Sequence, residues 1–209
     1  MSDTQPTVSS ARASTEKRPI LKPKFHHATL KTTRLQEMID FYTILVGVEV
    51  IFQYPLGAWL SNDEANHRIA LLAFPGLTDD AEKETHTGLH HSAFEYSSID
   101  ELLETYLRLK EAGIMPDMCL DHGMTTSFYY QDPDGNRVEL QVDNFGDWSQ
   151  SREFMRSALA FHEDPLGQPV DPDQLVAASE QGFTLDEIHE RAYAGQYKPA
   201  VLPSLPRPD

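Results

Sequence analysis

The stretch FHHATL at residues 25–30 returns as LHHSAF at residues 89–94, and this repetition decides the fold. Each stretch is short and mostly apolar with a doubled histidine, which predicts a strand. A helix cap, apolar residues at helical spacing and a glycine stop follow both stretches in the same order. A tandem structural repeat is the simplest explanation.

The spacing between the two copies is nearly constant along the repeat. The strand histidines His27 and His91 are 64 residues apart. The helix caps Thr33 and Ser98 are 65 residues apart, and the stop glycines Gly47 and Gly113 are 66 residues apart. Gln36 and Glu101 stand three residues after the caps, so both helices are expected to begin with a capping box. Three further strands are expected after each helix, at 48–54, 58–60 and 69–74 in the first copy and near 118, at 125–131 and at 137–142 in the second.

These elements predict an α+β fold in which two tandem βαβββ modules form an open, cleft-enclosing mixed sheet. One helix covers only one face of a four-stranded sheet, so the two sheets are expected to come together around a cleft that holds the functional site. The modules span residues 25–75 and 88–143 within a core domain of residues 25–145. Residues 1–24 mix Ser, Thr, Pro and both charges without periodicity and predict a mobile N-terminal arm.

Residues 146–209 are expected to form a helical and extended C-terminal tail. Helices are predicted at 171–181 and from Thr184, where Glu187 completes a capping box. We expect this tail to pack on the core or on a partner subunit.

The composition excludes several classes of function. Lys and Arg number 17 against 33 Asp and Glu, and the net charge of −16 repels nucleic acid and anionic membrane surfaces. No apolar run is long enough to span a membrane, and a single cysteine with no signal sequence leads us to expect a cytoplasmic protein. The chain has nine histidines and one cysteine, so any bound metal is expected to have imidazole and carboxylate ligands.

The doubled histidines are the first candidates for such a metal site. Neighbouring side chains of a strand face opposite ways, so one histidine of each pair is expected to point into the cleft. The symmetry of the repeat would bring these two histidines together. A lone strand histidine is more often a hydrogen-bonded core residue, but its recurrence at equivalent positions favours ligands.

A hairpin supplies the candidate for a third ligand. The sequence DPDGN at residues 132–136 is a strong turn signal. A three-residue loop closed by Asp132 and Asn136 would place Tyr129 directly opposite Glu139 on one face of the hairpin. The alternative is an exposed glutamate on a half-solvated strand. Two histidines and a carboxylate are the ligands of the facial triad in non-haem Fe(II) oxygenases, although the same set also binds Mn(II) or Zn(II).

The chain resembles the vicinal-oxygen-chelate superfamily, which includes glyoxalase I, bleomycin- and fosfomycin-resistance proteins and type I extradiol dioxygenases. The resemblance covers about residues 25–145 and rests on the strand histidine with its cap, on FYTILVG at residues 41–47 and, most specifically, on FYYQDPDGNRVEL at residues 128–140. Within the superfamily the chain is similar to the catalytic half of extradiol ring-cleaving dioxygenases, here as a single domain. The resemblance implies that the metal ligands are His27, His91 and Glu139.

The same resemblance implies three catalytic residues. His67 matches an acid/base histidine, His122 a histidine that hydrogen-bonds a substrate hydroxyl, and Tyr129 a tyrosine that contacts the bound catecholate. His122 lies only seven residues before Tyr129, closer than in longer members, and many relatives that are not dioxygenases carry a similar Asp-His-Gly. Glyoxalases place a carboxylate ligand in the strand at 69–74, which has none here. The other histidines are expected to face away from the metal or into solvent, and they are His26, His86, His90, His162 and His189.

The resemblance therefore implies an Fe(II)-dependent extradiol dioxygenase that cleaves the ring of a catechol-type aromatic with O2. The paired modules and the helical tail favour a homodimer or larger homo-oligomer. Two alternatives stay open. One is another metal-dependent vicinal-oxygen-chelate enzyme, an isomerase, epimerase or lyase of glyoxalase type. The other is a metal-free protein of resistance type that binds an aromatic compound.

Overall fold

The computed structural model describes residues 20–203, so most of the predicted arm and the last six residues of the tail lie outside the described residues. The first module comprises β1 (Ala28–Lys31), α1 (Leu35–Val46), β2 (Glu49–Tyr54), β3 (Gly57–Ser61) and β4 (Ile69–Leu72). A short 3₁₀ helix, η1 (Lys83–Thr85), precedes the second module, which comprises β5 (His91–Tyr96), α2 (Ile99–Glu111), β6 (Met118–Asp121), β7 (Thr125–Gln131) and β8 (Arg137–Asp143). The tail contributes α3 (Trp148–Ser157), α4 (Leu159–Glu163), β9 (Gln168–Pro169), α5 (Pro172–Glu180) and α6 (Leu185–Tyr193).

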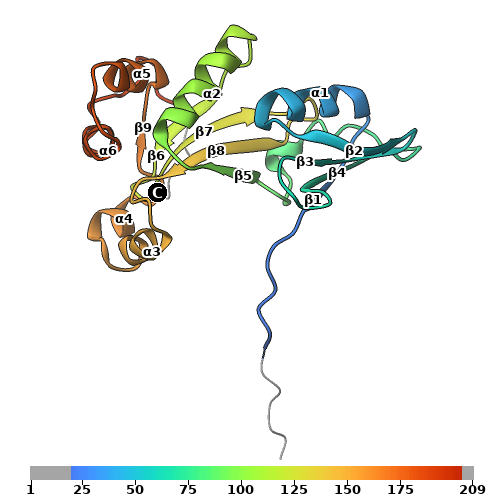
Figure 1. Ribbon diagram of the computed structural model, residues 1–209, viewed down its shortest axis with the longest axis horizontal. Helices are drawn as coiled ribbons and strands as arrows, with labels where there is room; N and C mark the ends of the chain where they lie inside the picture. Colours follow the sequence, from blue (N-terminus) through green and yellow to red (C-terminus); the bar gives the residue numbers. More distant parts are fainter. Residues whose placement is uncertain (1–19, 204–209) are drawn as a thin grey trace, which may run out of the picture.

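Both copies of the repeat form the predicted βαβββ module. The first sheet has the strand order β1-β4-β3-β2, and the second has the order β5-β8-β7-β6-β9. In each module the first strand pairs in parallel with the last, and the other pairs are antiparallel. The two mixed sheets lie side by side (Figure 1), which confirms the open α+β architecture. The strand β9 is an addition from the tail, which pairs with β6.

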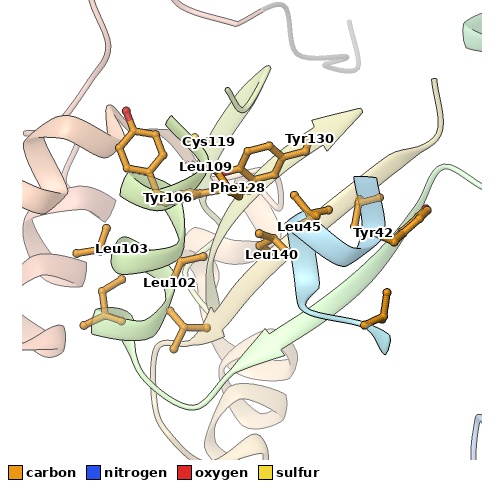
Figure 2. Packing of buried hydrophobic residues seen from close by; sticks show 14 of the residues in the cluster. Tyr42, Leu45, Leu102, Leu103, Tyr106, Leu109, Cys119, Phe128, Tyr130 and Leu140 are labelled. Atoms are coloured by element: carbon orange, nitrogen blue, oxygen red, sulfur yellow. The ribbon is translucent and has the colours of Figure 1, made fainter. Parts of the chain in front are cut away.

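The two module helices pack on each other and cover the same side of the sheets. Figure 2 shows their shared core, in which Leu45 of α1 lies near Leu140 of β8 and the α2 residues pack beside Phe128. The guanidinium of Arg108 in α2 donates a hydrogen bond to the carbonyl of Ile44, 2.6 Å away, near the end of α1. The opposite face of each sheet is therefore free of these helices. The doubled histidines lie at the start of β1 and β5, which are edge strands of the two sheets.

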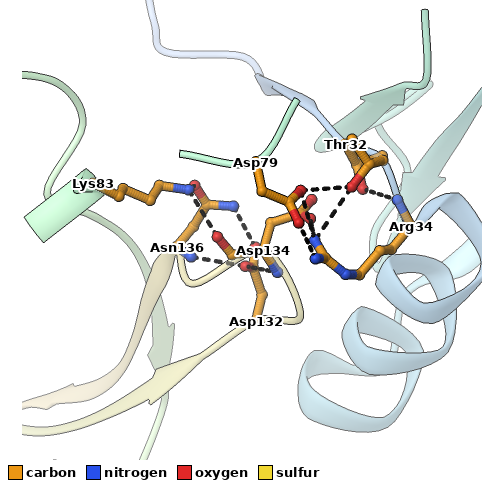
Figure 3. A network of polar contacts seen from close by, with 8 residues as sticks. Thr32, Arg34, Asp79, Lys83, Asp132, Asp134 and Asn136 are labelled. Carbon is orange, nitrogen blue, oxygen red and sulfur yellow. Dashed lines mark hydrogen bonds and ion pairs between the residues drawn. The ribbon is translucent and has the colours of Figure 1, made fainter. Parts of the chain in front are cut away.

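The predicted helix caps are confirmed at two of three positions. Ser98 and Thr184 accept hydrogen bonds from the third residue of α2 and α6, and Thr184 forms the full capping box. The predicted box at Ser98 is only half formed, because the Glu101 carboxylate accepts from the amide of Ser97 instead of Ser98. The prediction of a capping box at Thr33 is wrong, because α1 begins one residue later and has Arg34 at its cap position. The Thr33 hydroxyl donates instead to Asp79, which also pairs with the Arg34 guanidinium (Figure 3).

None of the helices in the described part of the chain is long and apolar enough to cross a membrane. The division into an arm, a core domain and a tail stays a prediction.

Leu45→Ala should lower the free energy of unfolding by about 2–5 kcal/mol, because Leu45 is fully buried between the two modules. The neighbouring Ile44→Ala is the matched control, since that side chain is 41% exposed and should cost less than about 1.5 kcal/mol. Urea denaturation at one fixed protein concentration measures both. Equal losses for the two variants would contradict the shared core.

Candidate functional site

Four side chains of the second module form a hydrogen-bonded chain on the face of the sheet that α2 leaves free. Glu139 accepts a hydrogen bond of 2.9 Å from the Tyr129 hydroxyl, and its other carboxylate oxygen lies 3.0 Å from Nε2 of His91. The Tyr129 oxygen lies 2.8 Å from Nε2 of His122. Side chains from β5, β7, β8 and the turn after β6 thus converge on one point. We call these four residues the second half-site.

The hairpin turn sets this arrangement. Tyr129 and Glu139 are direct partners across β7 and β8, as the turn sequence predicts. The Asp132 carboxylate accepts hydrogen bonds from the backbone amides of Asp134 and Asn136, and Gly135 takes the left-handed conformation with φ of 75°. Because neighbouring strand residues face opposite sides, a one-residue shift in register would turn Glu139 into the core.

Burial and hydrogen bonding tune the protonation of the second half-site. Burial raises the pKa of Glu139, but hydrogen bonds from His91, Ser127 and Tyr129 outweigh it and leave the pKa below its ordinary value. Burial and the neighbouring Glu139 charge raise the pKa of the Tyr129 hydroxyl far above its usual range. Burial lowers the pKa of His122. At neutral pH the site therefore combines a carboxylate, a protonated phenol and a neutral imidazole.

Three histidines of the first module form a separate cluster, the first half-site. His26, His27 and His67 are the one group of metal-ligating side chains among residues 20–203 whose donor atoms all lie within 4.8 Å of one another. The rings of His27 and His67 are 4.2 Å apart between centroids. Burial and the adjacent histidines lower the pKa of His67.

The structure brings the six expected site residues together in two sets. His27 lies with His67, whereas His91, Glu139, Tyr129 and His122 form the other set. His91 and Glu139 are in contact, but His27 does not come within 4.8 Å of both of them, so the three expected ligands do not meet among the described residues. The boundary between the two half-sites is the boundary between the two modules.

A cavity of about 620 Å³ lies between the two modules. Its walls include His26, Ala28 and Arg68 from the first module and His91 and Phe94 from the second. Its size and mixed lining suit a small aromatic molecule.

Three expectations about the remaining histidines are wrong. His26 and His90 do not point away from their neighbours: Nδ1 of His26 lies 3.0 Å from Nδ1 of His27, and Nδ1 of His90 lies 2.8 Å from Nδ1 of His91. The strands β1 and β5 begin only at Ala28 and His91, so His26 and His90 precede the alternating geometry of the strands. His189 is not solvated: its side chain is 15% exposed, and Nδ1 lies 2.8 Å from the buried carboxylate of Asp121. The signal was present in the sequence, since His189 follows Ile188 on the apolar stripe of its helix.

Comparisons with known proteins show which proteins the chain is similar to. A sequence model of the Glyoxalase/Bleomycin resistance protein/Dioxygenase superfamily matches residues 24–140. Biphenyl-2,3-diol 1,2-dioxygenase 2 of Rhodococcus globerulus is 36% identical over 186 residues, which are 89% of this chain and 95% of the relative. Biphenyl-2,3-diol 1,2-dioxygenase 3 of the same organism is 36% identical over 172 residues, 82% of this chain and 90% of the relative. A solved glyoxylase/bleomycin resistance protein/dioxygenase domain from Frankia sp. EAN1pec covers 59% of this chain and 93% of that chain at 19% identity, and its TM-score of 0.50 supports the fold alone.

Tyr129→Phe should raise the pKa of Glu139 in the metal-free protein, because it removes one of the hydrogen bonds that hold that pKa down. NMR titration of the Glu139 carboxyl carbon measures the change. Tyr130→Phe is the matched control, since this neighbouring hydroxyl is buried on the other face and has no hydrogen-bond partner within the described residues. An equal shift in both variants would show that the Tyr129 hydrogen bond does not stabilise the carboxylate.

Proposed function

Because the chain belongs to the glyoxalase/bleomycin resistance protein/dioxygenase superfamily, we propose that it is an Fe(II)-dependent extradiol dioxygenase that opens the ring of a catechol-type aromatic with O2. The observation that carries the proposal is the contact of His91, Glu139, Tyr129 and His122 on one face of the second sheet. The similarity to two named dioxygenases supports it, since both alignments cover more than four fifths of the chain and so extend beyond the matched family domain.

The donor atoms of the second half-site fit a divalent metal. Two ligands bound at right angles to one ion with bonds of about 2.1 Å lie about 3.0 Å apart. Nε2 of His91 and Oε2 of Glu139 have this separation. We propose that His27 joins them as the third ligand, and that Fe(II) is the metal, since two imidazoles and a carboxylate leave positions open for substrate and O2. Mn(II) and Zn(II) suit the same donors, and metal analysis distinguishes them.

The bound metal would supply Lewis acidity toward the catechol oxygens and redox chemistry toward O2. The chain's own residues would manage the protons. Tyr129, a phenol with a raised pKa, stays a hydrogen-bond donor and can hold a catecholate oxygen. His122, with a lowered pKa, is neutral at pH 7, and such an imidazole can exchange a proton with a substrate hydroxyl once the substrate replaces the Tyr129 oxygen beside Nε2. His67, also with a lowered pKa, is the second proton acceptor and donor, next to the third ligand His27.

We further propose that a second copy of the chain completes the site. One chain holds the first half-site and the second half-site in different modules, and a twofold dimer would pair each first module with the second module of its partner. The free face of the first sheet supports this arrangement, because it carries the stacked rings of Phe52, Tyr54 and Trp59, with Phe52 59% exposed. The proposal gives the homo-oligomer expected from the sequence a chemical role, which is to bring the two half-sites together.

After anaerobic loading with Fe(II), the protein should consume O2 and form a yellow ring-cleavage product from 2,3-dihydroxybiphenyl or catechol. Glu139→Ala should lose its iron, because a three-ligand site has no spare donor. His67→Ala should keep iron but lose about 10²–10⁴-fold in turnover, as expected for a missing acid/base group. Gln141→Ala, on the same face of β8, is the control and should keep both.

Full iron content in the Glu139 variant would remove this residue from the metal site. Zinc in the purified protein together with no product from a panel of catechols would instead favour a glyoxalase-type isomerase, epimerase or lyase. Binding of an aromatic compound without any metal would favour the resistance-type function.

Subunit complementation tests the shared site. His27→Ala and Glu139→Ala chains, each inactive alone, should form a mixed dimer with about half of the wild-type activity, since one of its two shared sites keeps every ligand. The matched control combines His91→Ala with Glu139→Ala, which damages both sites and should restore nothing. A mixed dimer without activity in the first pair, or an active monomer in sedimentation, would place the complete site within one chain.

A further inference from the structure

The turn that carries His122 is anchored by a buried carboxylate that the proposed chemistry does not use. Asp121, the last residue of β6, is fully buried. Its Oδ1 accepts a hydrogen bond of 2.8 Å from the backbone amide of Gly123, and its Oδ2 lies 2.8 Å from Nδ1 of His189 in α6. A buried carboxylate is costly unless its oxygens are hydrogen-bonded, so the His189 contact stabilises the whole turn.

The surrounding network assigns the proton to Nδ1 of His189. That nitrogen faces both Asp121, which can only accept, and the side-chain nitrogen of Asn144, 3.0 Å away, which can only donate. The Asn144 amide is oriented by three other contacts: its oxygen accepts from Thr126, and the two hydrogens of its nitrogen go to the carbonyl of Gly123 and to Oδ1 of Asp121, 3.4 Å away. Nδ1 of His189 therefore carries a hydrogen and donates it to Asp121.

The C-terminal tail also encloses the turn sterically. Gly123 has φ of 88°, and a Cβ there would lie 2.6 Å from Cε1 of Phe154 in α3 and 3.2 Å from Tyr193 in α6. A Cβ at Gly167 would collide with the carbonyl of Asp121. The turn therefore has little room to move while the tail is in place.

From these contacts we propose that His189 is a positioning residue. Its Nδ1–H holds Asp121, Asp121 holds the turn from residue 121 to 123, and the turn holds Nε2 of His122 at 2.8 Å from the Tyr129 hydroxyl. The tail helix α6 thus acts on the site through hydrogen bonds, without contact with substrate or metal. The effect on turnover rests on the proposed function, whereas the effect on the turn does not.

Two substitutions of similar polarity separate the hydrogen bond from packing. In His189→Asn the amide nitrogen takes the place of Nδ1, whereas in His189→Gln it takes the place of Nε2 and leaves Oδ2 of Asp121 without its donor. Hydrogen exchange of the Gly123 amide, followed by NMR in the metal-free protein, reports on the turn. Turnover of catechol by the Fe(II)-loaded protein, resolved into kcat and KM, reports on His122.

We expect His189→Gln and His189→Ala to speed Gly123 exchange and to lower kcat about 10-fold or more with KM little changed, because they remove a hydrogen bond to a buried charge. His189→Asn should stay within about 3-fold of wild type in both readouts. His162→Ala is the control and should change neither readout. His162 is an exposed residue of α4, and among the described residues its side chain forms a hydrogen bond only with the Met155 carbonyl.

Equal effects of the Asn and Gln variants would show that His189 acts by packing alone and would overturn the proposal. An unchanged kcat in all His189 variants, despite faster Gly123 exchange, would overturn the link to His122. If wild type cleaves no catechol but the Asn and Gln variants still differ at Gly123, the hydrogen-bonded link stands and the dioxygenase function fails.

Discussion

Asp132 closes the hairpin between β7 and β8, and the second half-site depends on that closure. Its carboxylate accepts hydrogen bonds from the turn amides of Asp134 and Asn136 and from the Tyr42 hydroxyl of α1. Burial raises the pKa of Asp132, because a buried carboxylate loses its hydration, and these hydrogen bonds oppose the rise. One side chain thus sets the register that faces Glu139 to Tyr129 and ties the second module to the helix of the first.

The shared helical core explains why the chemistry-bearing residues divide as they do. Because α1 and α2 pack on each other on one side of the sheets, the helix-free faces of both sheets point away from these helices (Figure 1). Each module carries its own polar residues on that face. The first module offers His27 and His67, and the second offers His91 and Glu139. A core that joins two modules through their helices stabilises the chain and leaves the helix-free face of each sheet available for polar residues.

The tail makes the two free faces unequal. Beside the second sheet, α3, β9 and α6 enclose the turn of His122, and the buried pair of Asp121 and His189 fastens that enclosure. On the first sheet, aromatic side chains such as Phe52 stay exposed. The second half-site is therefore enclosed by its own chain, whereas the free face of the first sheet keeps aromatic side chains exposed.

The sequence by itself determined the features that depend on neighbours along the chain: the tandem modules, the caps at Ser98 and Thr184, and the pairing of Tyr129 with Glu139. These follow from local hydrogen bonds and from strand periodicity, which a few residues specify. Only the tertiary structure decided that Thr33 bonds Asp79 rather than capping α1, that His189 is buried against Asp121, and that His27 lies apart from Glu139. These outcomes depend on residues more than 40 positions apart, whose meeting is set by how helices and sheets pack.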